Sequence, residues 1–165
     1  MINASYMRDI TLVSPVVPGP ESSMAIFTPK LDVDELNALF ARAFPAVGQS
    51  QTILVTSVEP GRIRMTGRYR EGLLRPGGVI SGPTLMSLAD SAAYALVLAH
   101  IGDQLMAVTS QLNMSFLRGA QPGDMHAEAE LLRLGRRLAV CDIRIWTESP
   151  DRLAAQANVT YAIPG

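Results

Sequence analysis

Apolar side chains recur at two different periods along this chain, and the change of period separates predicted helices from predicted strands. The first helical run contains four apolar side chains at helical spacing: Leu36, Leu39, Phe40 and Ala43. Asp32 and Glu35, which lead into this run, have the three-residue spacing of a capping box, and Pro45 follows its end. We therefore predict a short helix with one apolar face between Asp32 and Pro45.

A period of two replaces the helical period after Gly48. Residues 53–58 and 62–67 alternate in this way on either side of the turn Glu59-Pro60-Gly61, which predicts an antiparallel hairpin. Four more strands are predicted in the second half of the chain, over residues 107–117, 125–134, 137–147 and 153–163. Gly135-Arg136 joins the second and third of these strands as a hairpin turn.

The segment between the two groups of strands, residues 81–99, is almost uniformly apolar and predicts one long helix. Ser81 or Gly82 caps this helix, and Pro83 stands in its first turn, where the missing N–H of proline costs nothing. A meandering antiparallel sheet buries such a helix only if it wraps round it. The order of elements therefore predicts an α+β fold in which a curved antiparallel sheet wraps a long central helix.

A narrow polar stripe runs along the predicted long helix. Its members follow the spacing i, i+3, i+4 and i+7: Ser87, Asp90, Ser91 and Tyr94. Two interpretations are open, because the stripe is either the one face that touches water or the lining of a cleft. Asp90 favours the cleft, since Asp gains nothing from the helix dipole at mid-helix and a lone carboxylate is costly to bury without a purpose.

The start of the long helix offers a second chemical feature. Exposed backbone N–H groups there can hold a developing negative charge, and Gly82 has no side chain to block a substrate carbonyl. Gly82 and Asp90 are eight residues apart in the sequence, which is about 12 Å along a helix axis. That distance is too long for both groups to touch one carbonyl within one subunit. We therefore predict a symmetric dimer with shared sites.

Composition narrows the class of protein. The 165-residue chain is 48% hydrophobic with a net charge of −1, which fits one globular domain and gives no basic excess for a nucleic acid partner. A single cysteine, Cys141, excludes an internal disulfide framework and a Cys-rich metal site. A cytoplasmic location is the simplest expectation.

The hydrophobic long helix and the N-terminal segment each raise a question of organisation. Because the helix contains Pro83 and Asp90 and lacks flanking Lys or Arg, we expect it to be buried in protein rather than to cross a membrane. Residues 1–30 hold four prolines and no sustained periodicity. We expect them to form an extended N-terminal arm before a single domain over residues 31–165.

Residues 81–92 read Ser-Gly-Pro-Thr-Leu-Met-Ser-Leu-Ala-Asp-Ser-Ala. They resemble the signature His-Gly-Gly-x-x-x-x-Leu-Ala-Asp-x-Ala of the PaaI-like hotdog-fold acyl-CoA thioesterases. Residues 107–118, 123–129 and 135–140 also resemble that family, and the similarity covers roughly residues 51–164. The resemblance implies a hotdog fold, with the long helix inside the wrapped sheet, in homodimers that pair into homotetramers.

The resemblance also implies roles for single residues. Asp90 is the expected general base or nucleophile, and the Gly82 N–H is the expected oxyanion donor. Thr109 and Asn113, which simple alternation places together on the polar face of one strand, are expected near the cleft and the substrate.

The expected reaction is hydrolysis of an acyl-CoA thioester to the free acid and CoA, at sites on the dimer interface. No metal is expected, and no cofactor apart from the coenzyme A that belongs to the substrate. Ser81 stands where the family has His and is expected to contact substrate, while Pro83 stands where the family has a second Gly. These replacements remove a titratable group and an N–H donor, so a non-catalytic acyl-CoA-binding or assembly module stays open as the alternative.

Three basic side chains outside the long helix's polar stripe complete the candidates. Arg136 and Arg137, beside the predicted hairpin turn, either bind the phosphates of coenzyme A or form a solvated edge that discourages strand pairing. His100 ends the long helix, where a cation is expected to interact favourably with the helix dipole.

Overall fold

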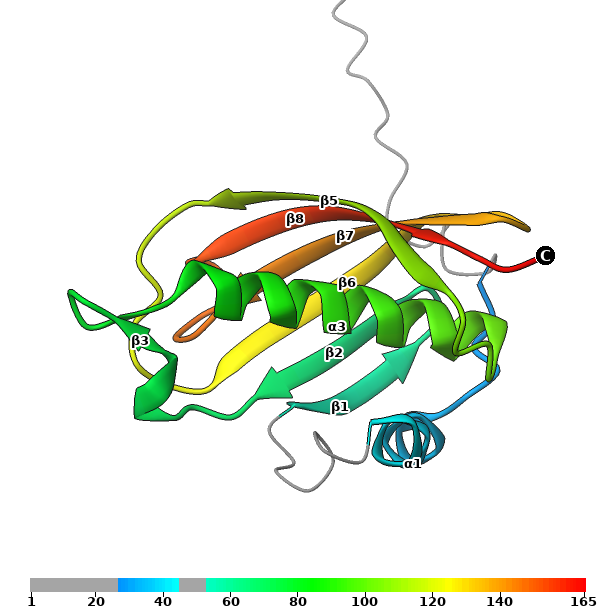
Figure 1. Cartoon of the computed structure of the whole chain (residues 1–165), viewed down its shortest axis with the longest axis horizontal. Helices are drawn as coiled ribbons and strands as arrows, with labels where there is room; N and C mark the ends of the chain where they lie inside the picture. Colours follow the sequence, from blue (N-terminus) through cyan, green and yellow to red (C-terminus); the bar gives the residue numbers. More distant parts are fainter. Residues whose placement is uncertain (1–26, 45–52) are drawn as a thin grey trace, which may run out of the picture.

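A six-stranded antiparallel sheet curves round one long helix in the computed structural model, which describes residues 27–44 and 53–165 (Figure 1). The helices are α1 (Val33–Ala43) and α3 (Gly82–Ile101). The sheet contains β1 (Ile53–Glu59), β2 (Arg62–Gly67), β5 (Val108–Phe116), β6 (Met125–Leu134), β7 (Leu138–Trp146) and β8 (Ala155–Ala162), in the spatial order β1-β2-β6-β7-β8-β5. This architecture confirms the α+β hotdog fold.

The loop between β2 and α3 has more structure than its Gly and Pro content predicts. A short 3₁₀ turn, η2 (Glu71–Leu73), leads into a small two-stranded ribbon of β3 (Leu74–Arg75) and β4 (Val79–Ile80). The Ser81 N–H then donates to the Leu73 carbonyl, which fixes the point where α3 begins. Most of the arm predicted for residues 1–30 lies outside the described residues.

The central position of α3 follows from its composition. Eleven of its twenty residues are buried, and leucines such as Leu88, Leu96 and Leu98 are fully enclosed. Each such leucine contributes about 1.5–3 kcal/mol by burial. By length and composition α3 is apolar enough to cross a membrane, but the sheet already covers most of it. The sheet comes close because its inner positions include many small side chains: Ala127, Ala129, Ala139, Ala155 and Ala157.

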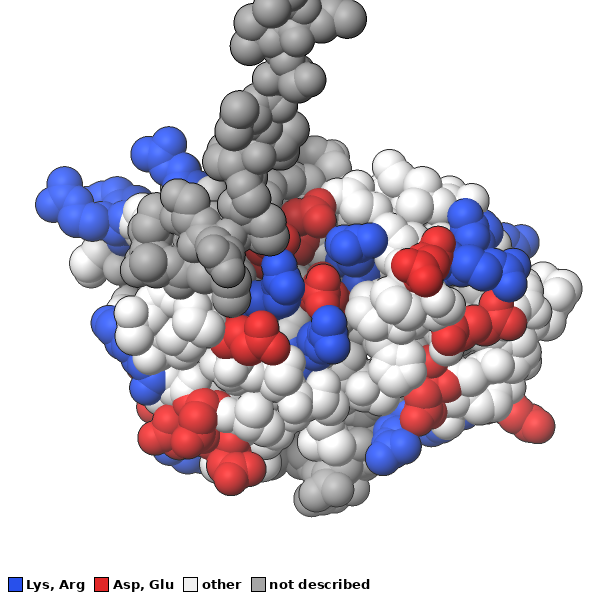
Figure 2. Space-filling view, turned by 180° about the vertical axis from the view of Figure 1, so that it is seen from behind, with Lys and Arg blue, Asp and Glu red and all other residues white. Residues whose placement is uncertain are grey.

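The outer face of the sheet is polar and carries charges of both signs. Neighbouring strands place Arg64 opposite Glu128, with 2.8 Å between guanidinium nitrogen and carboxylate oxygen, and Arg62 opposite Glu130. Figure 2 shows acidic and basic side chains interspersed over this side of the molecule. The polar stripe of α3 lies on the other side of the sheet, which the helix covers.

The two edges of the sheet differ in cover. At β1 the side chain of Asn37 on α1 pairs with the main chain of Val55, donating to its carbonyl and accepting from its N–H, both at 3.0 Å. The Asn37 amide thus supplies the two hydrogen bonds that a neighbouring strand would make with Val55, so α1 covers part of the β1 edge. β5, at the other end of the sheet, has no strand beyond it among the described residues, and most of its side chains are exposed on both faces.

A β-bulge in β5 corrects one prediction. Simple alternation puts Thr109 and Asn113 on the same face, but the register shifts between Thr109 and Gln111. Thr109 therefore lies opposite the buried Tyr161 on the inner face, whereas Asn113 lies opposite Asn158 on the outer face. The prediction that Asn113 lies near the cleft is wrong for this reason.

His100 is also placed differently from the prediction. Its side chain is only 3% exposed, its Nε2 accepts from the Gly61 N–H at 2.9 Å, and its Nδ1 lies 2.8 Å from the Leu96 carbonyl. Because Nε2 is the acceptor, the proton is on Nδ1 and donates to Leu96. Burial lowers the pKa of His100, so it is a neutral link between the end of α3 and the β1–β2 turn and not a helix-capping cation.

We expect His100 to make the protein less stable as the pH falls below about 6.5, the ordinary pKa of an unfolded histidine. Because its pKa is lowered in the folded state, the unfolded state binds more protons in that range, and one proton contributes a slope of at most about 1.4 kcal/mol per pH unit. Urea unfolding at several pH values measures this. The slope should be shallower in His100→Gln than in the wild type, and equal slopes in the two proteins would contradict the assignment.

Candidate active site

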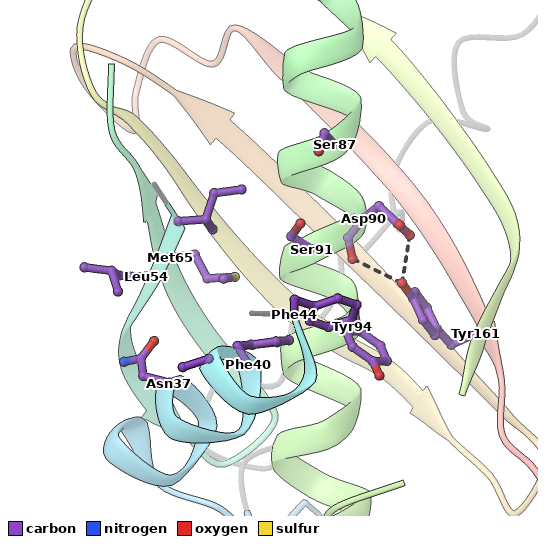
Figure 3. Close-up of a pocket in the computed structure, with 12 residues that line it drawn as sticks. Asn37, Phe40, Phe44, Leu54, Met65, Ser87, Asp90, Ser91, Tyr94 and Tyr161 are labelled. Carbon is purple, nitrogen blue, oxygen red and sulfur yellow. Dashed lines mark hydrogen bonds between the residues drawn. The ribbon is translucent and has the colours of Figure 1, made fainter. Parts of the chain in front are cut away.

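Two hydroxyl groups hold one oxygen of the Asp90 carboxylate, at the middle of α3. Figure 3 shows the one from Tyr161. Oδ1 of Asp90 accepts from Thr109 Oγ1 at 2.6 Å and from the Tyr161 hydroxyl at 2.8 Å. Oδ2 accepts no hydrogen bond from any residue that the structure describes. Hydrogen bonds to a charged acceptor are worth about 1.5–3 kcal/mol each. The carboxylate is therefore fixed through one oxygen and has the other available.

The polar stripe of α3 lines a cavity of about 380 Å³, and this answers the question that the sequence leaves open. All four stripe residues contribute to its wall, and Asp90 is the only charged residue in the described lining. The remaining wall comes from α1, β1, β2 and β8: Asn37, Phe40, Ala41, Phe44, Ile53, Leu54, Met65 and Tyr161. The cavity is thus an apolar chamber that one carboxylate enters.

Four aromatic rings form a continuous group on one side of this chamber. Phe40 and Phe44 from α1 lie 5.8 and 6.2 Å from the ring of Tyr94, and Tyr94 stacks on Tyr161 with 5.7 Å between ring centres. Figure 3 shows both α1 rings facing α3 across the cavity. Burial raises the pKa of Tyr94 and of Tyr161, so both remain hydroxyl donors at neutral pH. The group gives this side of the chamber an apolar wall without adding a charge.

The start of α3 lines a second and more open hollow of about 690 Å³. The Gly82 N–H has no acceptor among the described residues, and Pro83 has no N–H to offer. The Ser81 side chain does not cap the helix, since its Oγ lies 2.7 Å from Thr84 Oγ1 instead. One free backbone donor, that of Gly82, therefore stands at the positive end of the helix dipole.

One chain does not bring Gly82 and Asp90 together. They are the first and ninth residues of the same helix and they line different hollows. Ser81 lines the hollow at Gly82, and Thr109 contacts Asp90. The predicted site residues thus separate into two half-sites, with Asn113, Arg136 and Arg137 in neither.

Arg136 and Arg137 line neither hollow. The turn between β6 and β7 that carries them lies toward the C-terminal end of α3, opposite the end that carries Gly82 (Figure 1). Arg75 and Arg118 line the hollow at Gly82 instead. Neither Arg75 nor Arg118 forms an ion pair with a described residue.

Three features of the site are absent from the sequence interpretation. Tyr161 had one available signal, because it is the only polar side chain among the inward positions of β8, which are otherwise Ala155, Ala157 and Val159. The aromatic wall from α1 and the position of Arg75 depend on packing and had no local signal.

No three His, Cys, Asp or Glu side chains gather into a metal-binding group within residues 27–44 and 53–165.

Comparison with known proteins gives consistent results. A sequence model of the thioesterase superfamily matches residues 77–160. A protein of Saccharolobus solfataricus that is named as an esterase, SSO1253, is 30% identical to this chain over 139 residues, which are 82% of this chain and 87% of that protein.

Solved structures agree with the sequence matches. The structure of a protein of Silicibacter sp. TM1040 that is named as a thioesterase matches 87% of this chain and 97% of its own, with 36% identity and a TM-score of 0.76. The structure of a protein of Ralstonia eutropha JMP134 that is named as a thioesterase and as phenylacetic acid degradation-related matches 78% of this chain and 99% of its own, with 26% identity and a TM-score of 0.68.

Proposed function

This chain belongs to the thioesterase superfamily, and from that premise we propose that it hydrolyses an acyl-CoA thioester to the free acid and CoA. Membership confirms the resemblance to PaaI-like hotdog thioesterases that residues 81–92 carry, and it gives thioester hydrolysis as the class of reaction. The observation that carries the proposal is the Asp90 carboxylate, which enters an apolar cavity with one oxygen held and one oxygen free.

The proposed chemistry uses the free oxygen of Asp90. Oδ2 takes a proton from a water molecule as the water oxygen adds to the thioester carbonyl, or Oδ2 itself adds and forms a mixed anhydride that water then hydrolyses. In both routes the C–S bond breaks and CoA leaves as a thiolate that takes up a proton. Both routes also place negative charge on the carbonyl oxygen, and the Gly82 N–H is the donor suited to hold it.

We infer that the complete site forms between two copies of the chain. β5 is the one sheet edge left open among the described residues, and exposed apolar side chains lie on it and beside it: Met106, Val108, Phe116 and Leu117. Two β5 strands pairing antiparallel would form an isologous interface and continue the sheet. Pairs of such dimers would give the homotetramer that the resemblance implies.

The ends of β5 support this shared site. The first residues of the strand carry Thr109, which contacts Asp90. The last residue, Phe116, lies against Gly82, because a Cβ added to that glycine would meet the Phe116 ring at 3.3 Å. Antiparallel pairing about the middle of β5 sets the Thr109 end of one strand against the Phe116 end of the other. The Gly82 N–H of one subunit then approaches the Asp90 cavity of the other.

The coenzyme A part of the bound substrate would extend out of this joined site through the hollow at Gly82. Arg75 and Arg118 line that hollow, and guanidinium groups bind phosphates through paired hydrogen bonds. We therefore propose these two arginines for the phosphates of CoA. Arg136 and Arg137, which the sequence favours, are at the far end of the same subunit and are the weaker candidates.

The non-catalytic alternative has one observation in its favour. The start of α3 carries no titratable side chain in place of the family's His, and the Ser81 hydroxyl that stands there bonds to the Thr84 hydroxyl. A protein of that kind would bind acyl-CoA in the same cavity without releasing a thiol. The two functions therefore differ in a product that is simple to measure.

We expect free thiol to appear when the purified protein is incubated with acyl-CoA esters at neutral pH. A thiol-reactive dye follows the release over a panel of straight-chain, branched and aromatic acyl groups, with a heat-inactivated sample as control. Turnover should be highest for acyl groups that fit a cavity of about 380 Å³. Calorimetric binding of acyl-CoA without thiol release for every acyl group would favour the non-catalytic module.

A further inference from the structure

The contact between Tyr161 and Asp90 joins two residues that are 71 positions apart, and nothing in the hotdog signature of residues 81–92 assigns a role to the tyrosine. Tyr161 is 3% exposed and stands at an inward position of β8, directly opposite Thr109 of β5. The two hydroxyl groups therefore approach the same carboxylate oxygen from neighbouring strands.

The ring of Tyr161 is held more firmly than the side chain of Thr109. It stacks on Tyr94 with an interplanar angle of 26°, and the Tyr94 hydroxyl is itself tied to the Leu105 carbonyl at 2.8 Å. The Tyr161 hydroxyl also lies 3.3 Å from the main-chain carbonyl of Asp90. Thr109, in contrast, is exposed on the open edge strand. The tyrosine is thus the fixed point against which the carboxylate is oriented.

We propose that Tyr161 is a positioning residue that holds Oδ1 of Asp90, so that Oδ2 is the only oxygen presented to water or to the substrate carbonyl. This inference rests on the proposed thioesterase function. With Oδ1 bound to a rigid donor, rotation of the carboxyl group breaks a hydrogen bond, and the reacting oxygen stays at one place in the cavity. Because Tyr161 stays protonated at neutral pH, it donates throughout the working range.

The inference makes Tyr161→Phe the informative substitution. Phenylalanine keeps the ring, its stacking on Tyr94 and the filling of the inner face, and removes only the hydroxyl group. We expect kcat to fall about 10- to 100-fold while KM changes little, because the hydroxyl is bonded to Asp90 and the ring that lines the cavity is kept.

Two further variants separate positioning from a loss of structure. Tyr69→Phe removes the hydroxyl of a half-buried tyrosine that lines neither hollow, and we expect its kcat and KM to match the wild type. Thr109→Val removes the other donor to Oδ1 and should lower kcat with little change in KM, as Tyr161→Phe does. A merely structural role for Tyr161 would lower the melting temperature and leave the kcat and KM of the folded protein in place.

Failure of this inference can be told apart from failure of the proposed function. If the wild type releases thiol and Tyr161→Phe does so with wild-type kcat, the positioning role is overturned and the thioesterase remains. If the wild type releases no thiol, the function fails, and the carbon-13 NMR signal of the Asp90 carboxyl group at neutral pH tests the contact directly. A chemical shift that differs between Tyr161→Phe and the wild type supports the positioning, and equal chemical shifts overturn it.

Discussion

Asp90→Asn is expected to remove thioester cleavage while leaving the fold intact. The structure makes this substitution unusually selective, because Thr109 and Tyr161 both donate to the same oxygen, Oδ1. An asparagine side chain can keep that oxygen and both hydrogen bonds. The change then falls on Oδ2, which becomes an amide nitrogen that can neither take a proton from water nor attack a carbonyl. We expect kcat to fall by about 10³-fold or more.

Thiol release and thermal unfolding measured on the same preparation check this expectation. The melting temperature of Asp90→Asn should stay near that of the wild type, since no buried packing is lost. Asp103→Asn is the matched control, because Asp103 lies in the loop after α3 and pairs with Arg42 at the surface. Turnover by Asp90→Asn at the wild-type rate would rule out both the base and the nucleophile role of the carboxylate.

Mixing two inactive variants is expected to restore activity if each site combines the Asp90 of one chain with the Gly82 of another. The first variant is Asp90→Asn. The second is Gly82→Val, whose side chain would stand in front of the free N–H and should lower kcat by about 10²-fold or more, the usual cost of losing an oxyanion donor. The new Cβ would meet only the Phe116 ring, at 3.3 Å, and this exposed ring must shift by a few tenths of an ångström to admit the valine.

The size of the restored activity follows from the symmetry of a dimer. Random reassociation of equal amounts makes half of the dimers mixed, and one site in each mixed dimer has both groups intact, which gives about a quarter of wild-type activity. Co-refolding of the two chains followed by a thiol-release assay measures it. Gly72→Val serves as the control glycine substitution, since a Cβ at that position meets nothing within 4 Å. A mixture as inactive as its components would place both groups of each site in one chain.

Local patterns were sufficient to predict most of the fold. The capping box of Asp32 and Glu35, the two hairpins and the long helix all depend on residues close in sequence, and the structure has each of them. Asp90 and Gly82 were also accessible, because a charge in an apolar helix and a bare glycine at its start are visible without a fold. The roles predicted for them remain to be tested by the experiments above.

The wrong placements have one cause in common, which is that a neighbour distant in sequence decides the outcome. Asn113 was expected near the cleft together with Thr109, because strict alternation puts both on one face, and a single bulge after Thr109 places them on opposite faces. His100 was taken as a cation from its place at a helix end, but the Gly61 N–H, 39 residues away, needs an acceptor and makes the imidazole neutral.

The sequence by itself determined the elements, the central helix and the two chemical groups at its start and middle, because these follow from periodicity and from side-chain chemistry within one segment. Only the tertiary structure decided that the stripe lines an aromatic chamber, that Tyr161 and Thr109 bind one oxygen of Asp90, and that Gly82 lies in a separate hollow. The physical reason is that hydrogen bonds and cavities arise between side chains that folding brings together, and periodicity contains no information about which distant strand will supply the partner.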